Sequence, residues 1–252
     1  MPGPSLARAA AAALLLLAAP ALSSSLRAAA AAAAAAEDDS LVVLPAAPAP
    51  TPPCASPYNS SLESSCFRAV ATDRVSNVTI RAYEAAGAAV TFLAASEPGE
   101  LDYQQGLGVA IQRFITYFVP GFNSARTPVP RTVPIVSLRF GSPADPFNYK
   151  WGTGMALPAS VYPTSDTAPR PDDFTLLFYT PFVANPLVAV HHFVTPALPN
   201  DADWAAAVGY LTEHVPRGYS AVGGAAPVLA IYDGESTTTT RNNEVWLAVV
   251  KA

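Results

Sequence analysis

Two stretches of the chain place their apolar residues at the spacing of an amphipathic helix. In the first, apolar side chains recur every three or four positions after Asp102, which can cap a helix, and the pattern ends before Pro120. In the second, residues 201–215, they again share one face, with Asn200 as the cap and Pro216 as the stop. Each apolar face must pack against another element. The first face consists of Leu107, Ile111, Phe114, Ile115 and Phe118.

For most of the remaining chain beyond residue 66, alternating or continuous runs of apolar residues between turn-like breaks predict short β-strands. Pro134 interrupts one of them and demands an edge position or a bulge, because proline has no ladder donor. Residues 141–171 are dense in proline, glycine and aromatic residues and are interpreted as a long surface loop. The predicted strands are 67–72, 75–82, 88–95, 131–140, 173–180, 187–194, 227–233 and 242–250.

The order of these elements repeats along the chain. Strands, one amphipathic helix and further strands occur twice in succession. A helix with a single apolar face packs on a sheet rather than inside a bundle. The sequence therefore predicts an α+β fold: a distorted antiparallel β-barrel built from two pseudo-repeats, each carrying one helix.

The N-terminal region has the composition of an export signal followed by a linker. Residues 1–25 contain Arg8, an alanine- and leucine-rich run and then small residues, the order of a signal peptide. Residues 26–53 are rich in alanine and proline and are predicted to be a disordered linker before the folded domain, 54–252. We expect a secreted protein with no membrane span in the mature chain; a plastid leader is the alternative.

Two further features agree with export. Cys54 and Cys66 are the two cysteines, and in an oxidising compartment they would close a small loop worth roughly 2–3 kcal/mol. Asn59 and Asn77 each begin an N-glycosylation tripeptide.

Composition excludes several functional classes. The net charge of −5 argues against a nucleic-acid partner, because phosphate binding relies on clustered lysine and arginine. The chain has no G-x-S-x-G nucleophile motif, no phosphate-binding loop and no dinucleotide fingerprint. We therefore expect a monomeric binding protein rather than an enzyme.

Four segments carry a resemblance to a known family. RNNEVWLAVVKA, residues 241–252, resembles the closing strand of the SOUL haem-binding proteins, and RTVPIVSLRF, residues 131–140, is similar to their M-T-[AV]-P-[IV] strand. FTLLFYTP and LVAVHHF resemble two further strands of that family, in the same order. Arg131 stands where the family usually has methionine. The connection between Thr180 and Leu187 is short for the family.

The resemblance implies a duplicated barrel with two helices that binds haem or free porphyrin without covalent attachment. We therefore predict reversible tetrapyrrole binding, as a carrier, buffer or scavenger. The alternatives are an extracellular interaction module that has lost its ligand cleft, or an enzyme acting on an apolar small molecule.

The candidate binding residues follow from the chemistry of haem, an apolar disc with two propionates and an iron. The apolar face of the first helix is the richest surface for the disc, and Arg113 and Arg126 are the candidates for the propionates. His191 and His192 are adjacent in a predicted strand and point to opposite faces, so one of them would face any pocket and could bind the iron.

Overall fold

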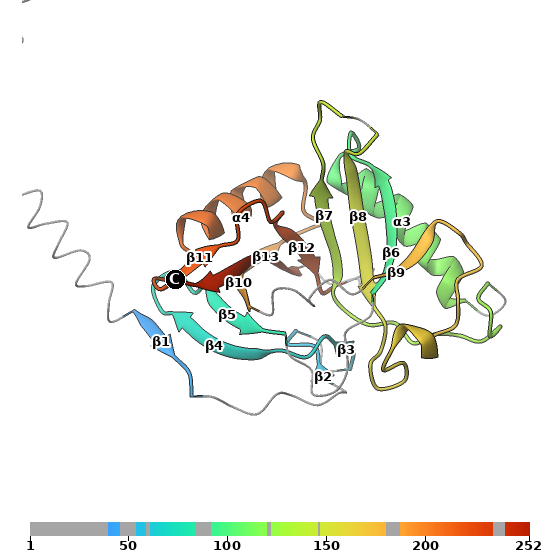
Figure 1. Cartoon of the computed structure of the whole chain (residues 1–252), viewed down its shortest axis with the longest axis horizontal. Coiled ribbons are helices and arrows are strands. Elements are labelled where there is room, and N and C mark those ends of the chain that lie inside the picture. The colour runs from blue at the N-terminus through green and yellow to red at the C-terminus, as the bar shows by residue number, and fades with distance from the viewer. Residues whose placement is uncertain are drawn as a thin grey trace, which may run out of the picture. The chain divides into compact units, whose positions relative to one another are not determined.

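The computed structural model describes residues 40–45, 54–58, 61–83, 92–119, 122–145, 147–179, 187–233 and 240–252 (Figure 1). Two compact units are distinguished, Met1–Leu41 and Val42–Ala252, and the second is the folded unit described below. The predicted signal peptide, most of the predicted linker and Asn59 lie outside the described residues. Among the helices that are described, none has the length and apolar character needed to cross a membrane.

One sheet of eleven strands dominates the fold, in the order β1-β4-β5-β10-β13-β12-β7-β8-β6-β9, with β11 also paired to β13. Its pairs from β4 to β9 are antiparallel. A separate two-stranded sheet consists of β2 and β3. The strands are β1 (Leu41–Val43), β2 (Cys54–Ala55), β3 (Glu63–Ser64), β4 (Arg68–Asp73), β5 (Thr79–Ala82), β6 (Phe92–Pro98), β7 (Ile135–Phe140), β8 (Lys150–Ala156), β9 (Leu176–Tyr179), β10 (Leu187–Thr195), β11 (Tyr219–Ala221), β12 (Val228–Ile231) and β13 (Arg241–Lys251).

The predicted two-repeat barrel is wrong, although the α+β class holds. The strand order runs from β1 at one end to β9 at the other, and these ends are not paired with each other within the described residues. A barrel needs that last pair of strands, because only full closure removes both edges of a sheet. Here the β12–β7 pair joins the two halves of an open sheet. β1 also lies inside the predicted linker, and Leu44 donates its backbone N–H to the Val70 carbonyl at 2.8 Å.

The two helices form where the apolar spacing predicts them. Helix α3 spans Tyr103–Phe118 with Asp102 as N-cap, and α4 spans Asp201–Glu213 with Asn200 as N-cap. Each cap accepts backbone N–H groups of the first turn and completes a capping box. The rings of Tyr103 and Trp204 meet edge to face at 5.1 Å, so the helices touch on the same face of the sheet (Figure 1).

The segment interpreted as a long loop contains an interior strand. β8 lies between β7 and β6; it pairs with β6 along its whole length and with β7 from Lys150 to Met155. The sequence KWGTGMA does not predict a strand, because glycine is a poor strand former. Gly152 and Gly154 are used for close packing: a Cβ at either position would come within 3.1 or 3.3 Å of a phenylalanine ring.

Two other local predictions are corrected. Pro134 directly precedes the interior strand β7, so it removes no ladder donor from the strand itself. The predicted strand 75–82 begins only at Thr79, because Asp73 Oδ1 accepts the backbone N–H groups of Val75 and Ser76 in a turn. Asn77 lies exposed in that turn with φ of 55°.

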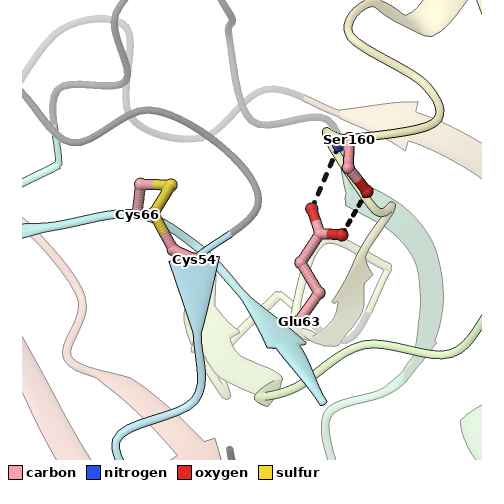
Figure 2. Close-up of a disulfide and its surroundings, with 4 residues drawn as sticks. All are labelled: Cys54, Glu63, Cys66 and Ser160. Atoms are coloured by element: carbon pink, nitrogen blue, oxygen red, sulfur yellow. Dashed lines mark hydrogen bonds between the residues drawn. A yellow bond between two sulfur atoms is a disulfide. The ribbon is translucent and has the colours of Figure 1, made fainter. Parts of the chain in front are cut away.

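The helix-free face of the sheet carries a hydrophobic core cluster. Alternate residues of the central strands point to it, including Val136, Val190, Ala230 and Trp246. From the described parts of residues 54–67, Tyr58, Leu62 and Phe67 pack against this core. The predicted disulfide between Cys54 and Cys66 is present and closes this segment into a loop (Figure 2).

Candidate functional site

A cavity of about 500 Å³ lies beside α3, on the helix-bearing face of the sheet. Small-molecule pockets are typically roughly 300–1,000 Å³. α3 packs on the sheet through Tyr103, Gly106 and Ala110, which are buried, whereas Ile115 is 43% exposed. The sheet therefore covers only part of the apolar surface of α3. The five apolar residues of this helix that were predicted to bind the ligand all line the cavity: Leu107, Ile111, Phe114, Ile115 and Phe118.

The sheet supplies the opposite wall through one row of side chains. Ile135 in β7 is in register with Met155 of β8 on one side and with Ile231 of β12 on the other. Residues in register across antiparallel strands point to the same face, so these three form a continuous apolar strip. All three line the cavity. Its remaining lining residues are Leu62, Arg131, Thr132, Val133, Leu198, Tyr232, Asp233 and Arg241.

The cavity is apolar inside and carries charge at its edge. Arg131 is exposed and forms no ion pair or hydrogen bond with any other described residue. Arg241 donates to the Asp233 carbonyl, and the Asp233 carboxylate accepts the backbone and side-chain N–H groups of Asn242. Arg131 is therefore the cation best placed to meet an anionic group of a ligand that enters the cavity.

The two arginines predicted to bind propionates lie in other surroundings. Arg113 pairs with the buried Glu97 at 2.9 Å, and Arg126 pairs with Asp172 at 2.6 Å. Burial raises the pKa of Glu97, against the opposing effect of Arg113. Neither arginine is among the residues that line the α3 cavity.

The adjacent histidines point to opposite faces, as their strand position predicts. His191 lies under α4, with its ring 4.4 Å from that of Tyr210, and burial together with His192 and His214 lowers its pKa. His192 lies on the helix-free face and stacks on Tyr58 at 4.7 Å. Neither histidine lines the α3 cavity. The described residues contain no cluster of three or more histidine, cysteine or acidic side chains suited to a metal ion.

A buried carboxylate lies next to the cavity, on the helix-free face. Glu244 is fully buried, and its carboxylate accepts hydrogen bonds from both Nη atoms of Arg81, at 2.7 and 2.8 Å. The hydroxyls of Tyr58 and Tyr232 and the Trp246 indole N–H also donate to it, at 2.6, 2.8 and 2.7 Å. Tyr232 links this cluster to the cavity because it lines that cavity as well. The donors already surround the carboxylate, which favours a structural role.

Glu244 makes the stability of the fold depend on pH. Burial alone would raise the pKa of its carboxyl, but Arg81 and the hydrogen-bond donors outweigh burial and hold that pKa below its ordinary value of 4.5. A lowered folded-state pKa stabilises the fold above about pH 4.5, and this contribution disappears as pH falls through the folded-state value. We expect the stability difference between wild type and Glu244→Gln to shrink on acidification. Urea unfolding at pH 7, 5 and 3 measures it; a difference that grows toward pH 3 would contradict the assignment.

A second hollow, of about 440 Å³, lies on the helix-free face of β6, β7, β8 and β9. Its walls are aromatic and aliphatic, including Phe92, Leu138, Phe140 and Phe178, above the backbone of Gly152 and Gly154. Among its described lining residues none is charged. It can hold an apolar group but offers no partner for an anion, so the α3 cavity is the better candidate for an amphipathic ligand.

Comparisons with known proteins leave the family open. No protein-family model matches the chain, and no curated protein is similar to it. Among solved structures, it is similar to a hydrolase from Listeria innocua, with a TM-score of 0.37 and 12% identity over 64% of this chain and 87% of that chain. A TM-score this low does not establish a shared fold. The resemblance to SOUL proteins therefore stays a prediction.

Proposed function

We propose that this protein binds a tetrapyrrole, haem or free porphyrin, reversibly and without covalent attachment in the α3 cavity. The observation that carries the proposal is the convergence of the α3 apolar face, the Ile135 strip and the cation Arg131 on one cavity. Burial of an apolar macrocycle against these side chains supplies most of the affinity, at roughly 25 cal/mol per Å². A binding protein of this kind acts as a carrier, buffer or scavenger.

The residues of the cavity fit the porphyrin better than they fit a tightly ligated iron. Leucine, isoleucine and phenylalanine side chains suit the ring, and Arg131 suits a propionate. Met155 is the thioether in the lining and the candidate axial ligand if iron is present, since the Tyr232 hydroxyl is engaged by Glu244. The proposal therefore includes free porphyrin and places little of the affinity on the metal.

Mixing the purified protein with hemin tests the proposal. We expect a saturable shift of the Soret band and quenching of tryptophan fluorescence, with one binding site per chain. Iron-free protoporphyrin IX is expected to bind with similar affinity, because apolar burial dominates. Absence of saturation with both compounds would exclude the proposed function.

Replacing Arg131 with alanine is expected to weaken protoporphyrin IX binding about three- to fivefold, since an exposed ion pair contributes up to about 1 kcal/mol. The dimethyl ester of the same porphyrin is expected to bind both proteins equally. Fluorescence titration at low salt measures the ratio. Arg74→Ala, another exposed arginine in the β4–β5 turn, is the matched control. Equal losses for the acid and the ester would contradict a propionate contact.

We further propose that the protein acts after export, with Asn77 glycosylated. The disulfide Cys54–Cys66 supports an oxidising compartment, and Asn77 is exposed in the β4–β5 turn. Expression through a eukaryotic secretory pathway is expected to give a product that shifts in gel mobility on glycosidase treatment. Asn77→Gln should remove the part of the shift that belongs to this site, and an unchanged shift would contradict its modification.

A further inference from the structure

The charged residues that line the α3 cavity come from one end of the strands. Asp233 lies two residues beyond the end of β12, Arg241 is the first residue of β13, and Arg131 lies four residues before β7. β12 pairs antiparallel with both β13 and β7, so its end lies beside the beginnings of these two strands. Asp233, Arg241 and Arg131 therefore share one side of the cavity, called the strand-end rim below.

Among the described residues, the strand-end rim offers a ligand one free cation. The Arg241 guanidinium donates to the Asp233 carbonyl, and the Asp233 carboxylate accepts two N–H groups of Asn242. Arg241 and Asp233 thus carry opposite charges side by side, and these charges offset each other. Arg131 has no such partner in the described part of the chain and is exposed. An anionic group at this rim can therefore meet Arg131 and still keep much of its water.

The other described walls of the cavity carry no charge. The α3 wall consists of five apolar residues, and the sheet wall is the apolar strip of Ile135, Met155 and Ile231. These walls are dry: Phe114 on the helix and Ile231 on the sheet are each 1% exposed. A carboxylate pressed against them would lose its water without gaining a partner, which is costly. A ligand therefore binds well only if all its anionic groups can lie at the strand-end rim.

We propose that the α3 cavity selects tetrapyrroles whose carboxylates all lie on one edge of the macrocycle. The inference rests on the proposed function and names its substrate class. Such a ligand enters with its uncharged edge against the apolar walls and leaves its carboxylates at the rim beside Arg131. Protoporphyrin IX has this form, because its propionates are on neighbouring pyrrole rings. Coproporphyrin III carries a propionate on every pyrrole ring, so some of its carboxylates would face the uncharged walls.

The selection is tested by titrating the full chain with protoporphyrin IX, with coproporphyrin III and with the methyl esters of both. We expect coproporphyrin III to bind about thirtyfold more weakly than protoporphyrin IX, because its inner carboxylates lose water without a partner. The two esters have no charge and are expected to bind within about threefold of each other. Porphyrin fluorescence gives the Kd values, with the same low concentration of nonionic detergent in every sample to keep the porphyrins monomeric.

A cation placed on the α3 wall is expected to weaken the selection. Ile111 lines this wall without being fully buried, so the guanidinium of Ile111→Arg can reach the cavity and still contact water. The Kd of coproporphyrin III divided by that of protoporphyrin IX is expected to fall about tenfold in this variant. Val109→Arg is the matched control, because Val109 lies on the same helix but does not line the cavity. It should keep the wild-type ratio.

The outcomes separate this inference from the function beneath it. If protoporphyrin IX does not bind saturably, the proposed function itself fails. If both acids bind wild type equally, the function stands and the selection is overturned. If the coproporphyrin ester binds as weakly as its acid, bulk rather than charge limits binding, which also overturns the selection. An unchanged ratio in folded Ile111→Arg contradicts it as well. Should that variant fail to fold by circular dichroism, the acids and esters on wild type decide alone.

Discussion

Replacing Glu244 with leucine is expected to lower the free energy of unfolding by about 3–5 kcal/mol, a larger loss than we expect from any other single substitution proposed for this protein. The substitution leaves the Arg81 guanidinium, in a residue that is 8% exposed, without its counter-charge. It also removes the acceptor of two tyrosine hydroxyls and one indole N–H. A buried charge without a partner costs far more than a lost surface pair.

The double variant Arg81→Met/Glu244→Leu distinguishes the pair from simple packing. Because it removes both charges, it is expected to be more stable than Glu244→Leu alone. Glu213→Leu, an exposed glutamate at the end of α4, is the control and should change stability by no more than about 0.5 kcal/mol. Urea unfolding followed by circular dichroism gives all the values. If Glu244→Leu lowered the free energy of unfolding by less than about 1 kcal/mol, the Arg81–Glu244 ion pair would not be formed in the folded protein.

Replacing Ile111 with tryptophan is expected to weaken porphyrin binding about a hundredfold while leaving the fold intact. Ile111 lines the cavity without being fully buried, so an indole there can extend into the space that the macrocycle would occupy. Filling the cavity also removes apolar surface from water, so stability should hold or rise. This pattern, lost binding with retained stability, separates a ligand site from a packing site.

Val109→Trp is the matched control for this experiment. Val109 lies on the same helix, two residues away and therefore on the opposite side, and is 37% exposed. It is not a lining residue of the cavity. The control should bind porphyrin as wild type does in the same fluorescence titration. Equal binding by both variants would place the ligand elsewhere.

The helices and most strands are predictable from the sequence because their signals are local. Asp102 and Asn200 cap the helices as their positions in the sequence indicate, and β10 and β13 coincide closely with the apolar runs that predict them. Strand β8 is not predictable in this way, since its glycines serve contacts with Phe92 and Phe140, whose positions depend on the pairing of the strands. The predicted barrel closure is wrong for a related reason. The periodicity of apolar residues shows which face of a strand is apolar, but it does not show which strands pair at the edges of the sheet.

The apolar spacing of the sequence predicts the α3 side of the candidate site but not its charged residues. The α3 face is recognisable from its spacing, and all five of its residues line the cavity. Arg131 departs from the SOUL pattern, but the sequence does not mark it as a ligand contact, because its position beside α3 depends on the β7–β12 pairing. Arg113 lies on the predicted helix, yet its partner Glu97 comes from β6. No local pattern reveals such pairings.

The five isoleucines of the chain offer the most direct test of the α3 cavity as a porphyrin site. Ile111, Ile115, Ile135 and Ile231 line it, whereas Ile80 in β5 lines neither hollow. In methyl NMR spectra of isoleucine-labelled protein, bound protoporphyrin IX is predicted to shift the four cavity methyl signals by ring current and to leave Ile80 in place. Saturable binding with all five signals unmoved would contradict the account, because the macrocycle would then lie outside this cavity.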